Sequence, residues 1–167
     1  MSDAKGAASR PHIAGAVTFL VGVADDAHSR TAARFAALRA ARSGGSVALV
    51  HVVEPPDFQH WAAVEDLMRE ETNDTAEVLL ASIAKEVVAI TGTEPSEHIR
   101  EGRIGEQILG QIDDDPSINL LVVGAAPPDA GKGSLISWLA GQLAGQLHVP
   151  LVIVPGDLTD EQLRDLT

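Results

Sequence analysis

Apolar residues along this chain fall into two patterns, short unbroken runs and longer stretches in which they recur every three or four positions. The short runs are rich in Val, Leu and Ile, which is typical of strands buried on both faces of a sheet. They predict strands at residues 17–24, 46–53, 118–123 and 149–155. A fifth, more polar segment at residues 97–101 is predicted to be a short edge strand.

The periodic stretches predict helices between the strands, because apolar residues at intervals of three and four share one face of a helix. These helices are expected at residues 29–42, 58–90, 104–112 and 134–147. A short terminal helix is expected at residues 157–166, with Thr159 as its cap. The pair Asn73-Asp74 leaves open a break of the long second helix into two.

The alternation of apolar strands with helices predicts an α/β fold, in which a doubly wound parallel sheet carries helices on both faces. Ligands of such sheets bind beyond the carboxyl ends of the strands, where the strand order reverses. If the first and fourth strands are neighbours there, the loops after Ala24 and Gly124 line the crevice. The second loop, AAPPDAGKGS, has the glycines, lysine and serine of a phosphate-binding loop.

The length and charge of the chain narrow the classes of function. Its 167 residues suffice for one domain, predicted at residues 16–156 between a mobile N-terminal tail (1–15) and a short C-terminal helical tail (157–167). A net charge of -12 disfavours binding to nucleic acids and to anionic membranes. The absence of cysteine excludes disulfides, thiolate catalysis and cysteine metal sites, and it fits a reducing compartment.

One apolar segment, residues 13–24, has a second interpretation as the centre of a secretory signal, because basic residues precede it. The segment is too short to span a bilayer. We favour the interpretation as a buried strand, since the run leads into a helix start at Asp25-Asp26. A cytoplasmic protein is therefore expected.

Four of the predicted strands, in this order and spacing, resemble those of the universal stress protein (UspA) family. The sequences that carry the resemblance are LVGV at 20–23, LVHV at 49–52, INLLVVG at 118–124 and VPLVIVP at 149–155. The resemblance covers roughly residues 17–155. It implies a five-stranded parallel sheet of order 3-2-1-4-5 with two helices on each face.

Nucleotide-binding members of that family carry the motif G-x-x-G-x9-G-[ST] after the fourth strand, and this sequence keeps its first glycine as Gly124. The second glycine falls on Pro127 and the third on Ser137, which Trp138 follows. Pro127 removes an amide hydrogen that a phosphate would use. The large indole of Trp138 stands where a small hydroxyl residue belongs.

The other positions that the resemblance marks give a mixed result. The family's aspartate that faces the adenosine falls on Ala24, with Asp25 one position later, whereas its adenine-contacting valine is retained as Val52. The candidate residues left in the loop after the fourth strand are Gly131, Lys132, Gly133 and Ser134. Several aspartates surround this one lysine, so the pocket is interpreted as vestigial.

Other catalytic and metal-binding patterns are missing from the sequence. The six histidines never have the spacing of three or four that puts metal ligands on one helical turn, so no metal site is expected. We interpret His51 as a strand histidine with an internal hydrogen bond. No G-x-S-x-G nucleophile motif occurs, and no catalytic residue is predicted.

These observations favour a non-enzymatic stress-response protein that requires no ATP or other cofactor and acts through contacts with other proteins. The alternative is a nucleotide-binding protein that uses the loop at residues 124–134 for ATP, with slow hydrolysis or none.

A homodimer is expected through the last strand, which lies at one edge of the sheet. The pairing segment comprises Leu151, Val152, Ile153 and Val154. It has no charge or internal proline to protect it, and such an edge invites pairing with another chain. The resemblance implies the same contact. In the alternative arrangement, the terminal helix at residues 158–166 covers the edge within one chain.

Overall fold

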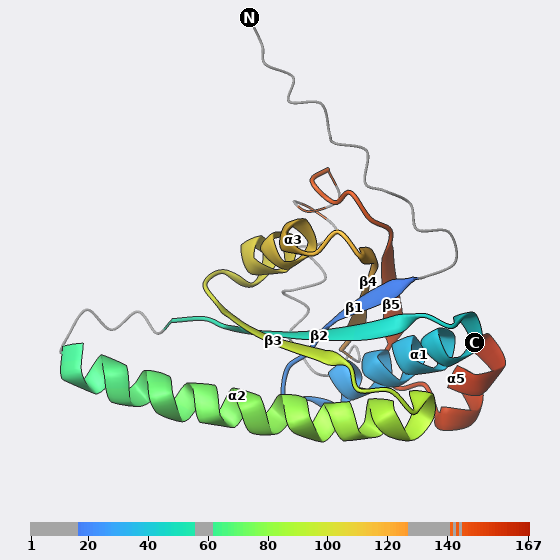
Figure 1. The fold of residues 1–167 in the computed structure, drawn as a ribbon, viewed down its shortest axis with the longest axis horizontal. Coiled ribbons are helices and arrows are strands. Elements are labelled where there is room, and N and C mark those ends of the chain that lie inside the picture. Colours follow the sequence, from blue (N-terminus) through green and yellow to red (C-terminus); the bar gives the residue numbers. More distant parts are fainter. Residues whose placement is uncertain (1–16, 56–61, 127–140, 142, 144) are drawn as a thin grey trace, which may run out of the picture.

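The computed structural model describes residues 17–55, 62–126, 141, 143 and 145–167, with the backbone alone for residues 62–66. Figure 1 shows the arrangement of its elements. In chain order they are β1 (Thr18–Gly22), α1 (Ala27–Ser43), β2 (Ser46–Val53), α2 (Ala62–Thr91), β3 (Ser96–Glu101), α3 (Ile104–Asp114), β4 (Ile118–Ala125), β5 (Leu151–Pro155) and α5 (Asp160–Leu166). The N-terminal tail and most of the segment predicted as the fourth helix lie outside the described residues.

The strands form one five-stranded sheet in the order β3-β2-β1-β4-β5, and every neighbouring pair is parallel. This confirms the predicted fold class and strand order. The order reverses between β1 and β4, so the loops that follow these two strands begin at the same edge of the sheet.

Helices cover both faces of the sheet, and the core has one part on each face. Figure 1 shows α1, α2 and α5 on one side and α3 on the other. On the first side, Phe19, Val21 and Leu49 pack against the alanine-rich face of α1 and against α2. On the second side, Leu20 and Val50 pack against α3. Successive residues of β1 and β2 therefore point to opposite faces, as the pleat of a strand requires.

Capping fixes both ends of α1. The side chain of Asp26 accepts a hydrogen bond from the Ser29 amide at the N-terminus, and Gly44 ends the helix at φ 69°, a left-handed conformation that favours glycine. The small face of Ala32, Ala36 and Ala40 is buried against the sheet. These small side chains allow the backbone of α1 to lie close to the sheet.

The long helix α2 continues without a break through Asn73 and Asp74, where the sequence left a division into two helices open. Both residues are exposed, so neither buries a polar side chain in the core. Thr72 and Thr75 direct their hydroxyls to backbone carbonyls one turn earlier. These bonds satisfy the threonine hydroxyls without interrupting the helix.

The short terminal helix α5 begins at the predicted cap. Thr159 accepts a hydrogen bond from the Gln162 amide, and the Gln162 side chain accepts one from the Thr159 amide. This reciprocal pair is a capping box. The helix is anchored by Leu163, which is fully buried in the core on the α1 side of the sheet.

Candidate functional site

The connection between β1 and α1 closes on itself through hydrogen bonds. The Val23 amide donates to the Val50 carbonyl (2.9 Å), and the Ala24 amide donates to the hydroxyl of the buried Ser29 (3.0 Å). The Ser29 amide donates to the Asp26 carboxylate (2.7 Å). These donors, which lie where a doubly wound sheet binds its ligands, are occupied by groups of the chain itself.

Gly124 lies directly beneath the first turn of α1. A Cβ atom at Gly124 would stand 2.1 Å from the His28 carbonyl oxygen, and one at Gly156 would stand 2.4 Å from the His28 Cβ. The Thr31 hydroxyl donates to the Gly156 carbonyl (3.1 Å) and ties the same turn to the residue after β5. The packing of α1 on β4 and β5 thus requires glycine at both positions.

The charged groups around this turn are mostly paired with one another. His28 lies 3.2 Å from the Asp26 carboxylate, and the Arg30 guanidinium donates to Glu86 (3.0 Å) and to the Ser82 hydroxyl (3.2 Å). Burial acts to raise the pKa of Glu86, but hydrogen bonds from Arg34 and Arg30 and their positive charges outweigh it and hold that pKa below its ordinary value. Asp25, in the same connection, is exposed.

A groove of about 510 Å³ opens beside Asp25, between the sheet and α2. It is lined by His51 of β2, by Asp25 of the β1–α1 connection and by Arg30 of α1. From α2 it is lined by Glu71, Thr72, Thr75, Ala76, Val78, Leu79 and Ser82. His51 Nδ1 lies 2.8 Å from the Val23 carbonyl oxygen. A carbonyl can only accept, so Nδ1 carries the proton, and Nε2 is the acceptor of the neutral ring.

The structure brings together only part of the residues predicted for a nucleotide pocket. Ala24 and Asp25 follow β1 and Gly124 lies near the end of β4, so all three lie at the carboxyl edge of the sheet. Val52 is 9% exposed and packs in the core on the α3 side, opposite to the groove. The remaining predicted residues lie outside the described part of the chain: Pro127, Gly131, Lys132, Gly133, Ser134 and Ser137.

The groove itself was missed by the sequence analysis. The predicted internal hydrogen bond of His51 is confirmed, but this histidine also lines the groove. A usable signal was present in α2, where Glu71, Thr75, Val78 and Ser82 recur at helical intervals and form a stripe of mixed polarity. Which part of this stripe remains exposed to solvent depends on where the sheet ends. The spacing of the residues alone does not predict which part is exposed.

Within the described ranges, no three histidine, aspartate or glutamate side chains come together as candidate metal ligands. In the same part of the chain, no helix is both long and apolar enough to cross a membrane.

Comparison with known proteins decides the family. A model of the universal stress protein family matches residues 17–155. The chain belongs to this family. The resemblance of its strand sequences is therefore confirmed over the predicted range. Comparison with curated protein sequences gave no significant match.

Solved structures of universal stress proteins share the fold at low sequence identity. UspA from Lactobacillus plantarum is 18% identical with a TM-score of 0.69, and the match covers 83% of this chain and 97% of that protein. A universal stress protein in complex with cAMP is 17% identical with a TM-score of 0.61, covering 84% and 98%. A family protein from Arabidopsis thaliana with AMP bound is 16% identical with a TM-score of 0.58, covering 87% and 94%.

Proposed function

We propose that this universal stress protein acts in the cytoplasm without ATP and without catalysis, through contacts with other proteins. The observation that carries the proposal is the loss of hydrogen-bond donors for a phosphate. The amides of Ala24 and Ser29 are occupied within the chain, and Pro127 has no amide hydrogen to offer.

The electrostatics of the same edge support this proposal. Asp25 and Asp26 place two carboxylates in the β1–α1 connection, and the nearby Arg30 is engaged by Glu86 and Ser82. A triphosphate carries several negative charges, so it would be repelled here unless a metal ion or further cations compensated.

The second candidate function is nucleotide binding, with slow hydrolysis or none. It is favoured by the two structural neighbours that carry AMP and cAMP. Gly124 also matches the first glycine of the family's nucleotide motif, and Val52 matches the family's adenine-contacting valine. Both residues have structural explanations in this chain, since one is a core residue and the other is required by α1.

Calorimetric titration with ATP and magnesium, and separately with AMP and cAMP, tests the proposal. We expect no saturable heat and no rise in melting temperature, because a ligand stabilises the native state only in proportion to its occupancy. Saturable binding with micromolar affinity would reject ATP independence.

A double substitution, Pro127→Gly with Trp138→Ser, tests whether the changes in the nucleotide motif are the reason why the chain does not bind ATP. It restores a backbone amide and a small hydroxyl residue, so ATP binding should become detectable. Pro128→Gly with Trp138→Ser is the matched control and should not gain binding. If the first double variant gains nothing until Ala24→Asp is added, the missing aspartate is the decisive loss.

A further inference from the structure

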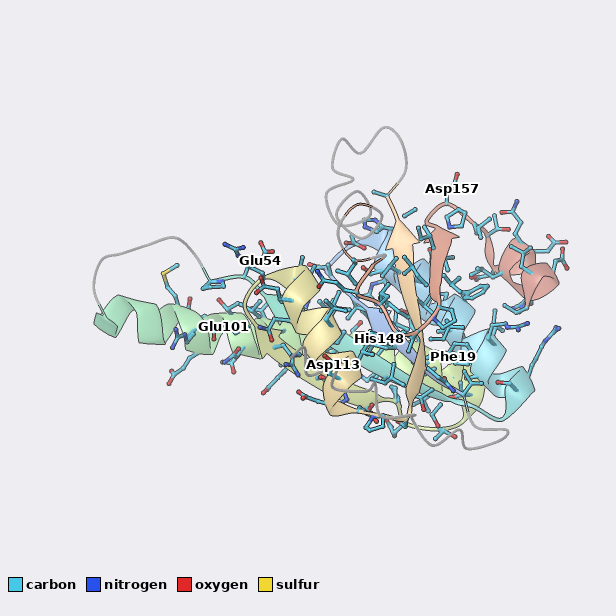
Figure 2. All side chains as sticks on the ribbon, turned by 90° about the horizontal axis from the view of Figure 1, so that it is seen from above. Phe19, Glu54, Glu101, Asp113, His148 and Asp157 are labelled. Carbon is cyan, nitrogen blue, oxygen red and sulfur yellow. The ribbon has the colours of Figure 1, made fainter. Side chains whose placement is uncertain are left out.

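Helix α2 extends beyond the body of the domain. Its 30 residues span about 45 Å at 1.5 Å per residue, whereas the 8 residues of β2 span about 26 Å. Both figures show the N-terminal part of α2 projecting past the sheet, and Figure 2 places Glu101, at the end of β3, beside the helix. An ion pair between Arg69 and Glu101 (3.2 Å) ties the helix to the sheet at this point.

One stripe of α2 connects this projecting part to the groove. Leu67, Glu71, Thr75, Val78 and Ser82 follow one another at intervals of four, four, three and four residues, so they lie along a single face of the helix. All but Leu67 line the groove. Val78 is 71% exposed, Leu67 is 59% exposed and the adjacent Met68 is 41% exposed. Large apolar side chains are thus left open along the groove and beyond it.

The charge of this surface is strongly negative. Asp25 and Glu71 stand on the two walls of the groove, and the one guanidinium among its described lining residues, that of Arg30, is engaged by Glu86 and Ser82. Residues 67–77 of α2 contain four carboxylates, and their one basic residue, Arg69, is paired with Glu101. The groove therefore offers apolar contacts flanked by acceptors.

The groove borders the β1–α1 connection, where the family's adenosine-facing aspartate falls on Ala24, because the next residue, Asp25, lines it. Val52, at the position of the family's adenine-contacting valine, lies in the core on the α3 face, whereas the groove opens on the α2 face.

We propose that this groove binds a basic amphipathic segment of a partner protein, an inference that rests on the proposed function through protein contacts. Lys or Arg side chains of the segment would meet Asp25 and Glu71, and its large apolar side chains would pack on Val78, Ala76 and Leu79. The stripe from Leu67 to Ser82 covers about 22 Å, the length of a helix of about 15 residues. Charge complementarity selects this occupant, because the carboxylates of Asp25 and Glu71 on the two walls favour basic side chains.

The probe is a synthetic helix-forming peptide of about 15 residues, with leucines at intervals of three and four and lysines at the remaining positions. Its binding is followed by fluorescence anisotropy at physiological salt. We expect saturable one-to-one binding. A second peptide with serine in place of every leucine should bind at least about tenfold more weakly, because the apolar contacts are lost.

Matched variants locate the contact. Glu71→Lys and Glu77→Lys change the net charge equally on exposed positions of the same helix, but only Glu71 lines the groove. Glu71→Lys should weaken peptide binding by about fivefold or more, and Glu77→Lys by about twofold or less. Val78→Ser should weaken it similarly, whereas Leu166→Ser, at a 60% exposed leucine on α5, should not.

Three outcomes overturn the inference: no saturable binding, an equal loss in Glu71→Lys and Glu77→Lys, or equal binding of the leucine-free peptide. The last two would indicate attraction by overall charge alone. Asp25→Asn, on the opposite wall, supplies a second test if Glu71→Lys fails to fold, and it should weaken binding too. The ATP titration is an independent measurement. If the protein bound both the peptide and ATP, the proposed ATP independence would be rejected, but the inference that the groove binds a basic segment would stand.

Discussion

Gly124 matches the first glycine of the family's nucleotide motif, yet its surroundings explain the glycine without a nucleotide. A Cβ atom there would meet the His28 carbonyl oxygen and carbon at 2.1 and 2.5 Å, and both are backbone atoms that a side-chain rotation cannot move. The first turn of α1 would have to lift away from β4. The packing of α1 on β4 is therefore sufficient to explain why this motif position is a glycine.

Gly124→Ala should lower the free energy of unfolding by about 2–3 kcal/mol, because overpacking against backbone forces the helix to shift. Urea denaturation followed by circular dichroism measures the change. Gly145→Ala is the control, since a Cβ atom there would have nothing within 4 Å and should change stability by less than about 0.5 kcal/mol. Equal stability of Gly124→Ala and wild type would mean that α1 is not packed on β4 as described.

Helices α1 and α2 are joined by one carboxylate between two guanidinium groups. Glu86 accepts hydrogen bonds from Arg34 at 2.7 Å and from Arg30 at 3.0 Å, and its side chain is 30% exposed. Arg30 also lines the groove, so this cluster fixes one of its walls. The partners are more than fifty positions apart in the sequence, and periodicity alone could not pair them.

Glu86→Gln should lower the free energy of unfolding by about 1 kcal/mol at neutral pH, since a partly exposed ion pair is screened by solvent. The folded-state pKa of Glu86 lies below its ordinary value of 4.5. Its contribution is therefore present above about pH 4.5 and is lost as the pH falls through the folded-state pKa.

Denaturation curves of Glu86→Gln and wild type should consequently converge in acid. Glu77→Gln, at an exposed position of the same helix, is the control and should show no such convergence. A difference between Glu86→Gln and wild type that stays constant from neutral pH to well below pH 4.5 would contradict this account.

At the scale of the whole molecule, the sequence was sufficient for the architecture but not for the groove. Unbroken apolar runs predict a parallel sheet covered on both faces, and the family resemblance supplied the strand order. The groove depends on long-range geometry instead. Asp25 follows β1, His51 lies on β2 and Val78 lies on α2, so these three groove residues come together only in the folded chain.

The outer edge of the sheet leads to a proposal about assembly. β5 is the last strand of the order, and Ile153 remains 43% exposed in spite of the terminal helix. Helix α5 instead places Leu163 in the core on the α1 side, so it leaves this side chain uncovered. Ile153 and its neighbours carry no charge to deter pairing.

We propose that two copies pair through Leu151, Val152, Ile153 and Val154 about a twofold axis. The prolines at 150 and 155 frame the segment and limit the length of the ladder, which suits one closed contact better than open-ended growth.

Light scattering coupled to chromatography should give the mass of a dimer. Ile153→Lys should shift the protein to monomer, because a lysine on an edge strand opposes pairing. Val78→Lys, at the 71% exposed position on α2, should leave the dimer intact. A monomeric mass for the unaltered protein at high concentration, or a dimer that survives Ile153→Lys unchanged, would reject this interface.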